Sequence, residues 1–438
     1  MNKKLFIAII AIIFLVSCRQ QTRIITNPAD YSHYMQLENQ QSLKSFQSIL
    51  TEISFWNQRL KDGVADDILA RVKLAGLYSA RFKVSGNIDD IHTSDSLYLL
   101  ANPLMRISSS SVFRSLATNC ITQHRFRQAK LYIDTALSMG DNKYYSLLMQ
   151  CDVAMELGNL FQAKKALEKL NDKFSFDYRI REAKLLDHEG KPEEAIKKME
   201  RGMQEVIESN NDVLFGWVKT NLGDMYGHAN RYKDAYRSYL DALERDPENI
   251  YALKGIAWLA FSHDKNTAEA KRILQYLSVV HPVPDYELML AKIADYENEP
   301  ATKNQLMNKF ITEVKHTRYG GMYNKYLFYL VADELKNLPE ALAIAETEVE
   351  NRPTGQSYDL LAWAKFKSGK KEEALKIAKE FVENKNFEPE ALYHLGVIYT
   401  DAGEVKKGRK YLMDAKQSSF ELGPAMSEQV TMAMEKTK

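Results

Sequence analysis

The chain has 438 residues, of which 45% are hydrophobic and 27% are charged, with 19 Gly, 11 Pro and 3 Cys. This composition excludes a disordered or collagen-like chain and a small disulfide-stapled scaffold, and it leaves room for long helices. The 59 Lys and Arg residues nearly balance the 58 Asp and Glu residues, so no net field favours nucleic acid or an anionic membrane surface.

The first 18 residues resemble the signal sequence of bacterial lipoproteins. Lys3 and Lys4 form a basic start, and a run of 12 apolar residues from Leu5 to Val16 leads to Ser17-Cys18. The run is too short to span a bilayer, and the small-x-small site of an ordinary secretory signal is absent. In the lipoprotein family the peptide is cut just before a cysteine that is lipidated. We therefore expect residues 1–17 to be a signal peptide and Cys18 to be the lipidation site.

Residues 18–33 begin with a polar stretch and are expected to form a tether between the membrane and the folded part. If this tether is extended as far as His33, its reach is roughly 50 Å. Stable attachment rests on the acyl chains, because no basic patch assists them. In lipoproteins, an Asp after the cysteine often marks inner-membrane retention, and an acidic run often marks surface export. Neither is present, so we expect a periplasm-facing outer-membrane protein, with the inner membrane and the cell surface as alternatives.

Residues 34–109 are predicted to form an N-terminal helical cap with degenerate repeats. The apolar residues Leu43, Phe46, Ile49, Leu50, Ile53 and Leu60 fall on one helix face. Leu74, Ala75 and Tyr78, with a second helix near Ile88 to Ala101, look like a worn copy of the helical pair that recurs further along. A stacked repeat array exposes an apolar face at its end, and such a region covers it.

Residues 110–420 carry a recurring pattern of small and apolar residues. Its clearest copy comprises Leu222, Gly223, Tyr226, Ala235, Tyr239, Ala242 and Pro247. This pattern resembles the tetratricopeptide repeat, a 34-residue helix-turn-helix unit. The family favours small residues at positions 8, 20 and 27, where they let the two antiparallel helices approach, and larger residues that fill the gaps. The resemblance implies an all-α fold, a right-handed α-solenoid of tetratricopeptide repeats.

The array has about nine units. Copies start near 110, 144, 176, 216, 250, 322, 355 and 389, with a degenerate unit between the fifth and sixth of these starts. The recurring interval of 34 residues, rather than any single motif, carries the resemblance. Residues 421–438 are predicted to form a C-terminal capping helix, for which Pro424 marks the start and Met426, Val430 and Met434 the apolar face.

The sequence shows no motif that carries chemistry. It has no His-Glu-x-x-His, no Cys-x-x-Cys, no Gly-x-Ser-x-Gly and no phosphate-binding glycine loop. We therefore predict no catalytic residue, no cofactor and no metal site, and hence a protein that is not an enzyme. Cys120 and Cys151 fall at packing positions of adjacent units, and two buried thiols are favoured over a disulfide.

The resemblance implies that positions 2, 5, 9, 12 and 13 of each first helix line a concave groove where ligands lie. The residues predicted to form a partner-binding groove are Trp217, Asp224, Tyr251, Lys254, Trp258, Phe261, Tyr323, Tyr326, Trp363 and Phe366. Exposed aromatic residues that gather on one face usually mark a binding site. The alternative is that positions 9 and 12 pack against the neighbouring unit, which would make these residues the edge of the core.

The groove residues do not reproduce the carboxylate clamp with which some members of the family hold chaperone C-termini, and Lys254 stands isolated. Mixed charge and several aromatics suit an extended or helical peptide. The leading hypothesis is a non-catalytic, membrane-tethered scaffold or adaptor that binds a peptide segment of an envelope protein of unknown identity. Acylated Cys18 would anchor the protein in the lipid bilayer. No nucleic acid is expected as a partner. The alternative is a peptide- or glycan-capturing lipoprotein of an uptake system, and a third hypothesis is a structural spacer.

Overall fold

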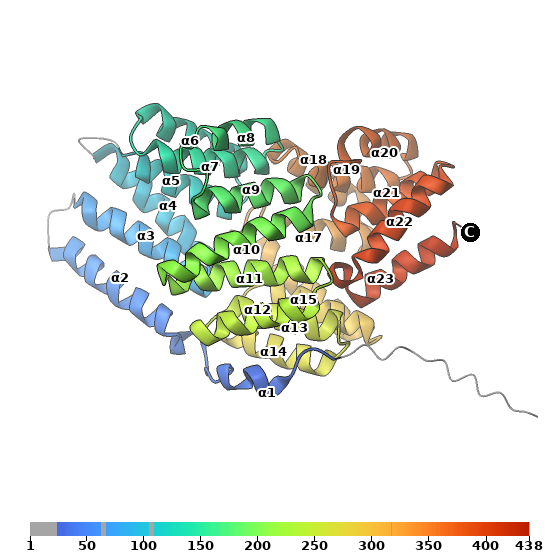
Figure 1. The fold of residues 1–438 in the computed structure, drawn as a ribbon, viewed down its shortest axis with the longest axis horizontal. Helices are drawn as coiled ribbons and strands as arrows, with labels where there is room; N and C mark the ends of the chain where they lie inside the picture. Colours follow the sequence, from blue (N-terminus) through green and yellow to red (C-terminus); the bar gives the residue numbers. More distant parts are fainter. Residues whose placement is uncertain (1–23, 63–66, 105–108, 317, 438) are drawn as a thin grey trace, which may run out of the picture.

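The computed structural model describes residues 24–62, 67–104, 109–316 and 318–437. Over these ranges the regular structure is helical and comprises 23 α-helices (Figure 1). The predicted signal peptide and Cys18 lie outside the described residues. None of the described helices combines the length and apolar character that a membrane span requires.

The helices follow one another as antiparallel neighbours, which confirms the predicted all-α solenoid. The N-terminal helices are α1 (Pro28–Tyr31), α2 (Lys44–Asp62), α3 (Ile68–Ser85) and α4 (Ile88–Ala101). The helices that then form consecutive pairs are α5 (Ser110–Thr122), α6 (Phe126–Met139), α7 (Lys143–Glu156), α8 (Leu160–Glu168), α9 (Phe176–His188), α10 (Pro192–Ser209), α11 (Asp212–His228), α12 (Tyr232–Arg245), α13 (Ile250–Ser262), α14 (Thr267–Val280), α15 (Asp285–Tyr296), α16 (Pro300–His316), α17 (Asn324–Tyr329), α18 (Leu338–Asn351), α19 (Gly355–Lys367), α20 (Lys371–Ile377), α21 (Pro389–Asp401) and α22 (Val405–Gln417). The chain ends in α23 (Ser419–Glu435), and α17 and α20 are prolonged by π-helical turns, Leu330–Glu334 and Ala378–Val382.

Small residues at the predicted spacing allow the helices to pack closely. A Cβ atom at Gly223 of α11 would lie 2.5 Å from the ring of Tyr239, and one at Gly255 of α13 would lie 2.4 Å from it. The tyrosine of α12 therefore fills space that both neighbouring helices leave open. Ala235 and Ala242, on the same helix, are completely buried. The recurring interval in the sequence thus corresponds to points of close helix contact.

The array winds into a superhelix whose successive turns touch (Figure 1). A Cβ atom at Gly158 would lie 2.7 Å from the carbonyl oxygen of Pro353, and the Glu156 carboxylate forms an ion pair of 2.7 Å with Arg352. Gly190 lies against the ring of Phe387 in the same way. These partners are about 200 residues apart, so one superhelical turn takes about six units of 34 residues.

The N-terminal segment packs against the outside of the array. The backbone N–H groups of Ile25 and Thr26 donate to the carboxylate of Asp264, at 3.0 and 2.9 Å. Tyr31 is fully buried, and its hydroxyl donates to Glu269 at 2.7 Å. The described residues from Ile25 onwards therefore belong to the folded part of the chain and not to the tether predicted for residues 18–33.

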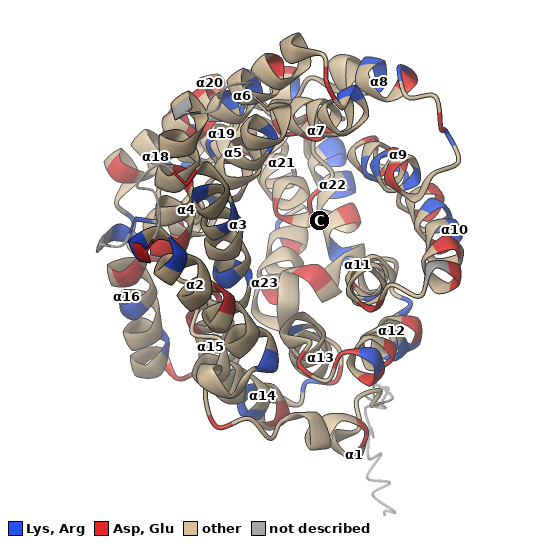
Figure 2. Cartoon of the chain, turned by 90° about the vertical axis from the view of Figure 1, so that its left-hand side faces the viewer, with Lys and Arg blue, Asp and Glu red and all other residues tan. Residues whose placement is uncertain are grey.

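The C-terminal helix is more than the cap predicted for residues 421–438. Its helical part packs on α21 and α22, the last pair, as a cap would. It also contacts α11, α13 and α15, which belong to earlier units. Figure 2 shows α23 inside the ring formed by the other helices. The superhelical winding brings these remote helices around the last unit, so α23 occupies the interior.

Candidate functional site

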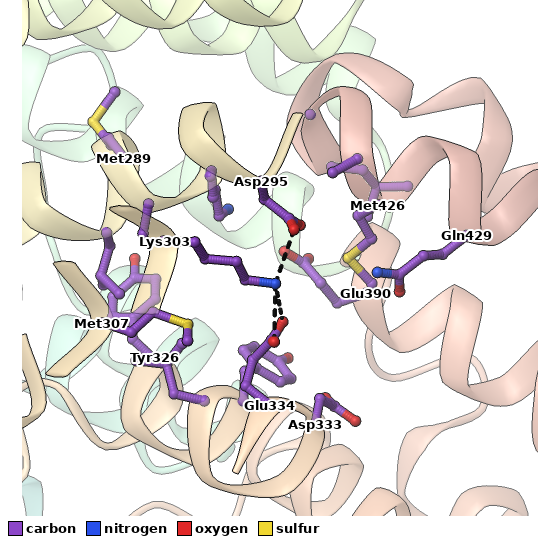
Figure 3. Close-up of a pocket in the computed structure, with 18 of the residues that line it drawn as sticks. Met289, Asp295, Lys303, Met307, Tyr326, Asp333, Glu334, Glu390, Met426 and Gln429 are labelled. Carbon is purple, nitrogen blue, oxygen red and sulfur yellow. Dashed lines mark hydrogen bonds and ion pairs between the residues drawn. The ribbon is translucent and has the colours of Figure 1, made fainter. Parts of the chain in front are cut away.

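A cavity of about 460 Å³ lies on the inner side of the second half of the array. Side chains of α13, α15, α16, α17, α19, α21 and α23 line it. Three methionines, Met289, Met307 and Met426, supply part of its apolar surface (Figure 3). Methionine side chains are flexible and polarisable, so this surface can adapt to apolar groups of different shape. The volume falls in the range of pockets that enclose a small ligand or a few side chains.

Most of the charges in the cavity wall neutralise one another. The Nζ atom of Lys303 lies 2.9 Å from a carboxylate oxygen of Asp295 and 2.9 Å from one of Glu334 (Figure 3). Lys367 forms an ion pair of 3.0 Å with Asp333. These pairs connect α15, α16, α17 and α19, and they fix the shape of the wall.

Lys292 and Glu390 are the two charged groups of the wall that make no hydrogen bond or ion pair with the described residues. The Nζ atom of Lys292 lies 5.3 Å from the centroid of the Trp258 ring, within reach of a cation–π interaction. Desolvation by the surrounding protein lowers the pKa of Lys292, although Glu390 acts in the opposite direction. The Lys292 side chain is exposed, so its unpaired ammonium group is accessible to a polar ligand atom.

The structure brings together only part of the predicted groove. The predicted residues that line the cavity are Lys254, Phe261, Tyr326 and Trp363. The predicted residues outside its lining are Trp217, Asp224, Tyr251, Trp258, Tyr323 and Phe366. Their assignment to a partner-binding groove stays a prediction.

The exposure of the predicted aromatics varies widely. Trp217, Tyr251 and Tyr326 are 38%, 50% and 45% exposed, whereas Phe261 and Trp363 are only 2% and 4% exposed. The expectation of exposed aromatics is therefore wrong for Phe261 and Trp363, which belong to the edge of the core. Phe261 packs edge-to-face against Trp258 at a centroid distance of 5.6 Å. The winding of the array covers both rings with neighbouring helices.

Lys254 is not isolated, contrary to the expectation from sequence. Its Nζ atom lies 3.3 Å from the carboxylate of Asp285, and the hydroxyl of Tyr323 donates to the same carboxylate at 2.7 Å. Burial alone would raise the pKa of Asp285, but Lys254 and Tyr323 bring it below its ordinary value. This cluster of Lys254, Asp285 and Tyr323 therefore connects α13, α15 and the turn before α17.

Asp224 has a similar connecting role in the neighbouring units. The hydroxyls of Tyr239 and Tyr251 both donate to its carboxylate, each at 2.6 Å. Burial raises the pKa of Asp224, while the two hydroxyls oppose the shift. The half-exposed Tyr251 of α13 is thereby held in place by a residue of α11.

The buried pair of His394 and Asp359 at the wall of the cavity was not among the residues predicted from the sequence. The Nδ1 atom of His394 lies 2.9 Å from a carboxylate oxygen of Asp359, and both side chains are buried. Trp363 stacks on the imidazole at 4.1 Å and donates its indole N–H to Asp333 at 3.0 Å. The only signal was that both residues fall near position 5 of successive first helices. No Ser, Thr or Cys side chain is among the described lining residues.

The residues of α23 that reach the cavity were also not among the predicted site residues. Leu422, Gly423, Pro424 and Met426 are among its lining residues, and Gln429 projects from the next turn (Figure 3). No local pattern could assign them to this place, because part of the wall that they complete, from Lys254 to Met307, lies more than 100 residues earlier in the chain.

The fold and the cavity together define a helical-repeat protein with a cavity on its inner surface. Family models of the tetratricopeptide repeat match residues 218–249 and residues 360–420, so this protein carries tetratricopeptide repeats in these two stretches. Both matching models describe a repeat and neither describes a catalytic family. The comparison with curated proteins finds no match.

The comparison with solved structures finds matches to this chain, including the following three. PilW, described as a widely conserved type IV pilus biogenesis factor, is 16% identical, with 48% of this chain and 96% of PilW covered and a TM-score of 0.37. A tetratricopeptide repeat protein from Parabacteroides merdae ATCC 43184 is 17% identical, with 60% and 98% covered and a TM-score of 0.34. The APC/C hetero-tetramer Cut9-Hcn1 contains a chain that is 10% identical, with 89% and 94% covered and a TM-score of 0.35.

Proposed function

We propose that this protein is a non-catalytic scaffold that binds a peptide segment of a partner protein on its concave surface. The observation that carries the proposal is the cavity with two unpaired groups of opposite charge, Lys292 and Glu390, beside adaptable methionines. A peptide supplies carbonyl groups for Lys292, amide groups for Glu390 and apolar side chains for the methionines. The tetratricopeptide repeats support a role in protein–protein interaction.

Site-specific crosslinking tests this assignment. Tyr326, which lines the cavity and is 45% exposed, is replaced by p-benzoylphenylalanine, and the chain is irradiated in its native membranes. Phe161 of α8, which is 71% exposed and does not line the cavity, receives the same replacement as a matched control. We expect a discrete protein adduct from position 326 alone, and a yield at least fivefold lower in the Lys292→Ala background. Equal adducts from both positions, or none from position 326, would remove the cavity from consideration.

The proposal includes a membrane tether through Cys18, which would be acylated and would hold the protein at the periplasmic face of a bacterial outer membrane. Six residue steps separate Cys18 from Ile24 and span at most about 20 Å. Because Ile25 and Thr26 are bound to Asp264, the edge of the array formed by α1, α12 and α14 would then face the bilayer at short range. A partner segment would be captured close to the membrane surface.

Detergent phase partitioning tests the tether. The wild-type protein is expected in the detergent phase and the Cys18→Ser variant in the aqueous or uncleaved fraction, since one residue carries the acyl chains. Identical partitioning of the two proteins would exclude acylation at Cys18, and fractionation of inner and outer membranes would decide the compartment.

The glycan alternative depended on tryptophan faces that could stack on sugars. Trp363 already stacks on His394 and Phe366, and Trp258 packs edge-to-face against Phe261 and Phe420. The peptide proposal needs neither face and is therefore preferred.

A further inference from the structure

The chain crosses its own concave surface just after α22. Gly423 has φ 75° and ψ 171°, which interrupts α23 between its first turn and the helix that continues from Pro424. We call residues 419–424 the latch. The helix beyond the latch packs on the last pair through Val430 and Met434, and Leu422 of the latch joins the same cluster. Phe420 and Glu421 of the latch reach across to α13 and α11.

The latch is bound to α13 by specific hydrogen bonds. The carbonyl oxygen of Phe420 accepts from the indole N–H of Trp258 at 3.1 Å and from the hydroxyl of Ser262 at 2.5 Å. These donors stand four residues apart and so lie on successive turns of one helix face. Phe420 is separated from these donors by about 160 residues, so the contact joins α23, the C-terminal helix, to the fifth pair.

The Phe420 side chain occupies a prepared apolar recess. Its ring lies 6.4 Å from that of Trp258 and 5.0 Å from that of Tyr232, and the residue is 7% exposed. A Cβ atom at Gly227 would lie 2.6 Å from the same ring, so the glycine leaves the space that the phenyl group fills. Gly423 then lies against Trp258 and Phe261.

The side chains that receive the latch are those that the repeat pattern assigns to ligand binding. Trp258 and Phe261 were predicted as groove residues from their positions in the first helix of their unit, and Ser262 is the next position of that set. The chain's own C-terminal segment therefore sits where a partner would be expected. The latch carries its carbonyl and its aromatic ring in the manner of a bound peptide.

One feature of the latch opposes its own docking. The Glu421 carboxylate lies 4.0 Å from His228 of α11. It also interacts electrostatically with Asp187 of α9, with Glu388, which directly precedes α21, and with Glu390 of α21. Burial among these groups raises the pKa of Glu421 to about 7, with His228 acting against the shift. A partner segment with a neutral residue at the position of Glu421 would avoid the free-energy cost of burying a carboxylate near other carboxylates. Such a segment could displace the latch.

We propose that the latch is an internal competitor for the concave surface, and that the partner segment shares its chemistry: an aromatic residue with a free carbonyl, followed by a neutral residue and an aliphatic one. This inference rests on the proposed function, and it adds the regulation of the same surface. Partner binding exchanges one set of contacts on Trp258 and Ser262 for another. The measured free energy of partner binding is therefore the difference between the free energy of binding to the open surface and the free energy of docking the latch.

A synthetic peptide of the chain's own sequence tests the exchange without a known partner. A fluorescently labelled peptide with the sequence of residues 416–432 is titrated against the full-length chain, against the Phe420→Ala variant, and against the double variant Phe420→Ala, Trp258→Ala. We expect the Phe420→Ala chain to bind the peptide at least tenfold more tightly than the wild type. The double variant is expected to lose this gain. A peptide with Gln in place of Glu421 is expected to bind more tightly still at pH 8.

A matched control separates opening of the recess from loss of stability. Phe126 of α6 is 2% exposed and lies outside the latch contacts, so Phe126→Ala removes an equally buried ring elsewhere. This variant is expected to gain no affinity for the peptide. Equal binding by wild type, Phe420→Ala and Phe126→Ala would overturn the proposal. So would a collapse of the helical signal in Phe420→Ala, because the latch would then be part of the fold rather than a removable occupant.

The two proposals fail separately. If position 326 crosslinks a partner but Phe420→Ala gains no peptide affinity, the scaffold assignment stands and the latch does not compete. If the peptide exchange succeeds but position 326 yields no adduct in membranes, the latch occupies its recess as proposed and the cavity is not the partner site.

Discussion

The substitution Glu421→Gln gives the sharpest test of the electrostatics inside the superhelix. Burial of Glu421, with Glu388, Glu390 and Asp187 around it and His228 acting oppositely, raises the pKa from 4.5 to about 7. Below pH 4.5 the carboxyl group is protonated in both the folded and the unfolded chain, so its titration costs no stability. Between pH 4.5 and about 7 the unfolded chain releases a proton that the folded chain retains, and stability falls as the pH rises.

The size of this effect follows from the shift. A difference of about 2.5 pKa units corresponds to about 3 kcal/mol, all of which is lost above pH 7. Glutamine keeps the shape of the side chain and removes the charge. The Glu421→Gln variant should therefore match the wild type at pH 4 and exceed its free energy of unfolding by up to about 3 kcal/mol at pH 8.

Chemical denaturation of both proteins across pH 4–8, followed by circular dichroism, measures this difference. Glu428→Gln, an exposed position on the same helix, is the control and should show no pH-dependent difference from the wild type. A Glu421→Gln curve that runs parallel to that of the wild type, or that lies below it at pH 8, would refute the assignment of a buried, repelled carboxyl group.

Two further predictions concern the packing of the array. Gly223→Ala places a Cβ atom 2.5 Å from the Tyr239 ring. We expect this substitution to lower the free energy of unfolding, measured by urea denaturation, by about 1–3 kcal/mol. A loss below about 0.5 kcal/mol would be inconsistent with this contact. Burial raises the pKa of Cys120 to about 11 and that of Cys151 to about 12, so in a Cys18→Ser chain neither thiol should react with a disulfide reagent at pH 7. Both should react after unfolding in guanidinium, and rapid modification of the native chain would contradict the buried thiols that the structure contains.

The local architecture could be predicted because its determinants are close in sequence. Gly223, Ala235 and Ala242 permit contact between two helices that are joined by a short turn, and the pattern recurs at an interval that the sequence displays. The helices therefore begin near the predicted starts, as at Ser110, Phe176 and Pro389. The unit that was predicted to start at 216 begins earlier, with α11 at Asp212, because the capping side chain of Asn211 accepts a hydrogen bond from the backbone of Leu214.

The candidate site could be predicted only in part. The repeat positions identified Lys254, Phe261, Tyr326 and Trp363, which do line the cavity, but they did not separate exposed rings from buried ones. Whether a residue at position 9 of a first helix is covered depends on the next helix and on the next superhelical turn. Trp363 is covered in this way by His394 of α21.

The sequence by itself determined that the chain forms paired helices and where most of them begin. The tertiary structure decided which inward residues meet, because small rotations between successive units add up over about six repeats and bring residues about 200 positions apart into contact. It also decided that Phe420 binds to Trp258 and that Ile25 binds to Asp264. Contacts of this kind depend on the cumulative rotation between many successive helices, and a local sequence pattern does not specify that rotation.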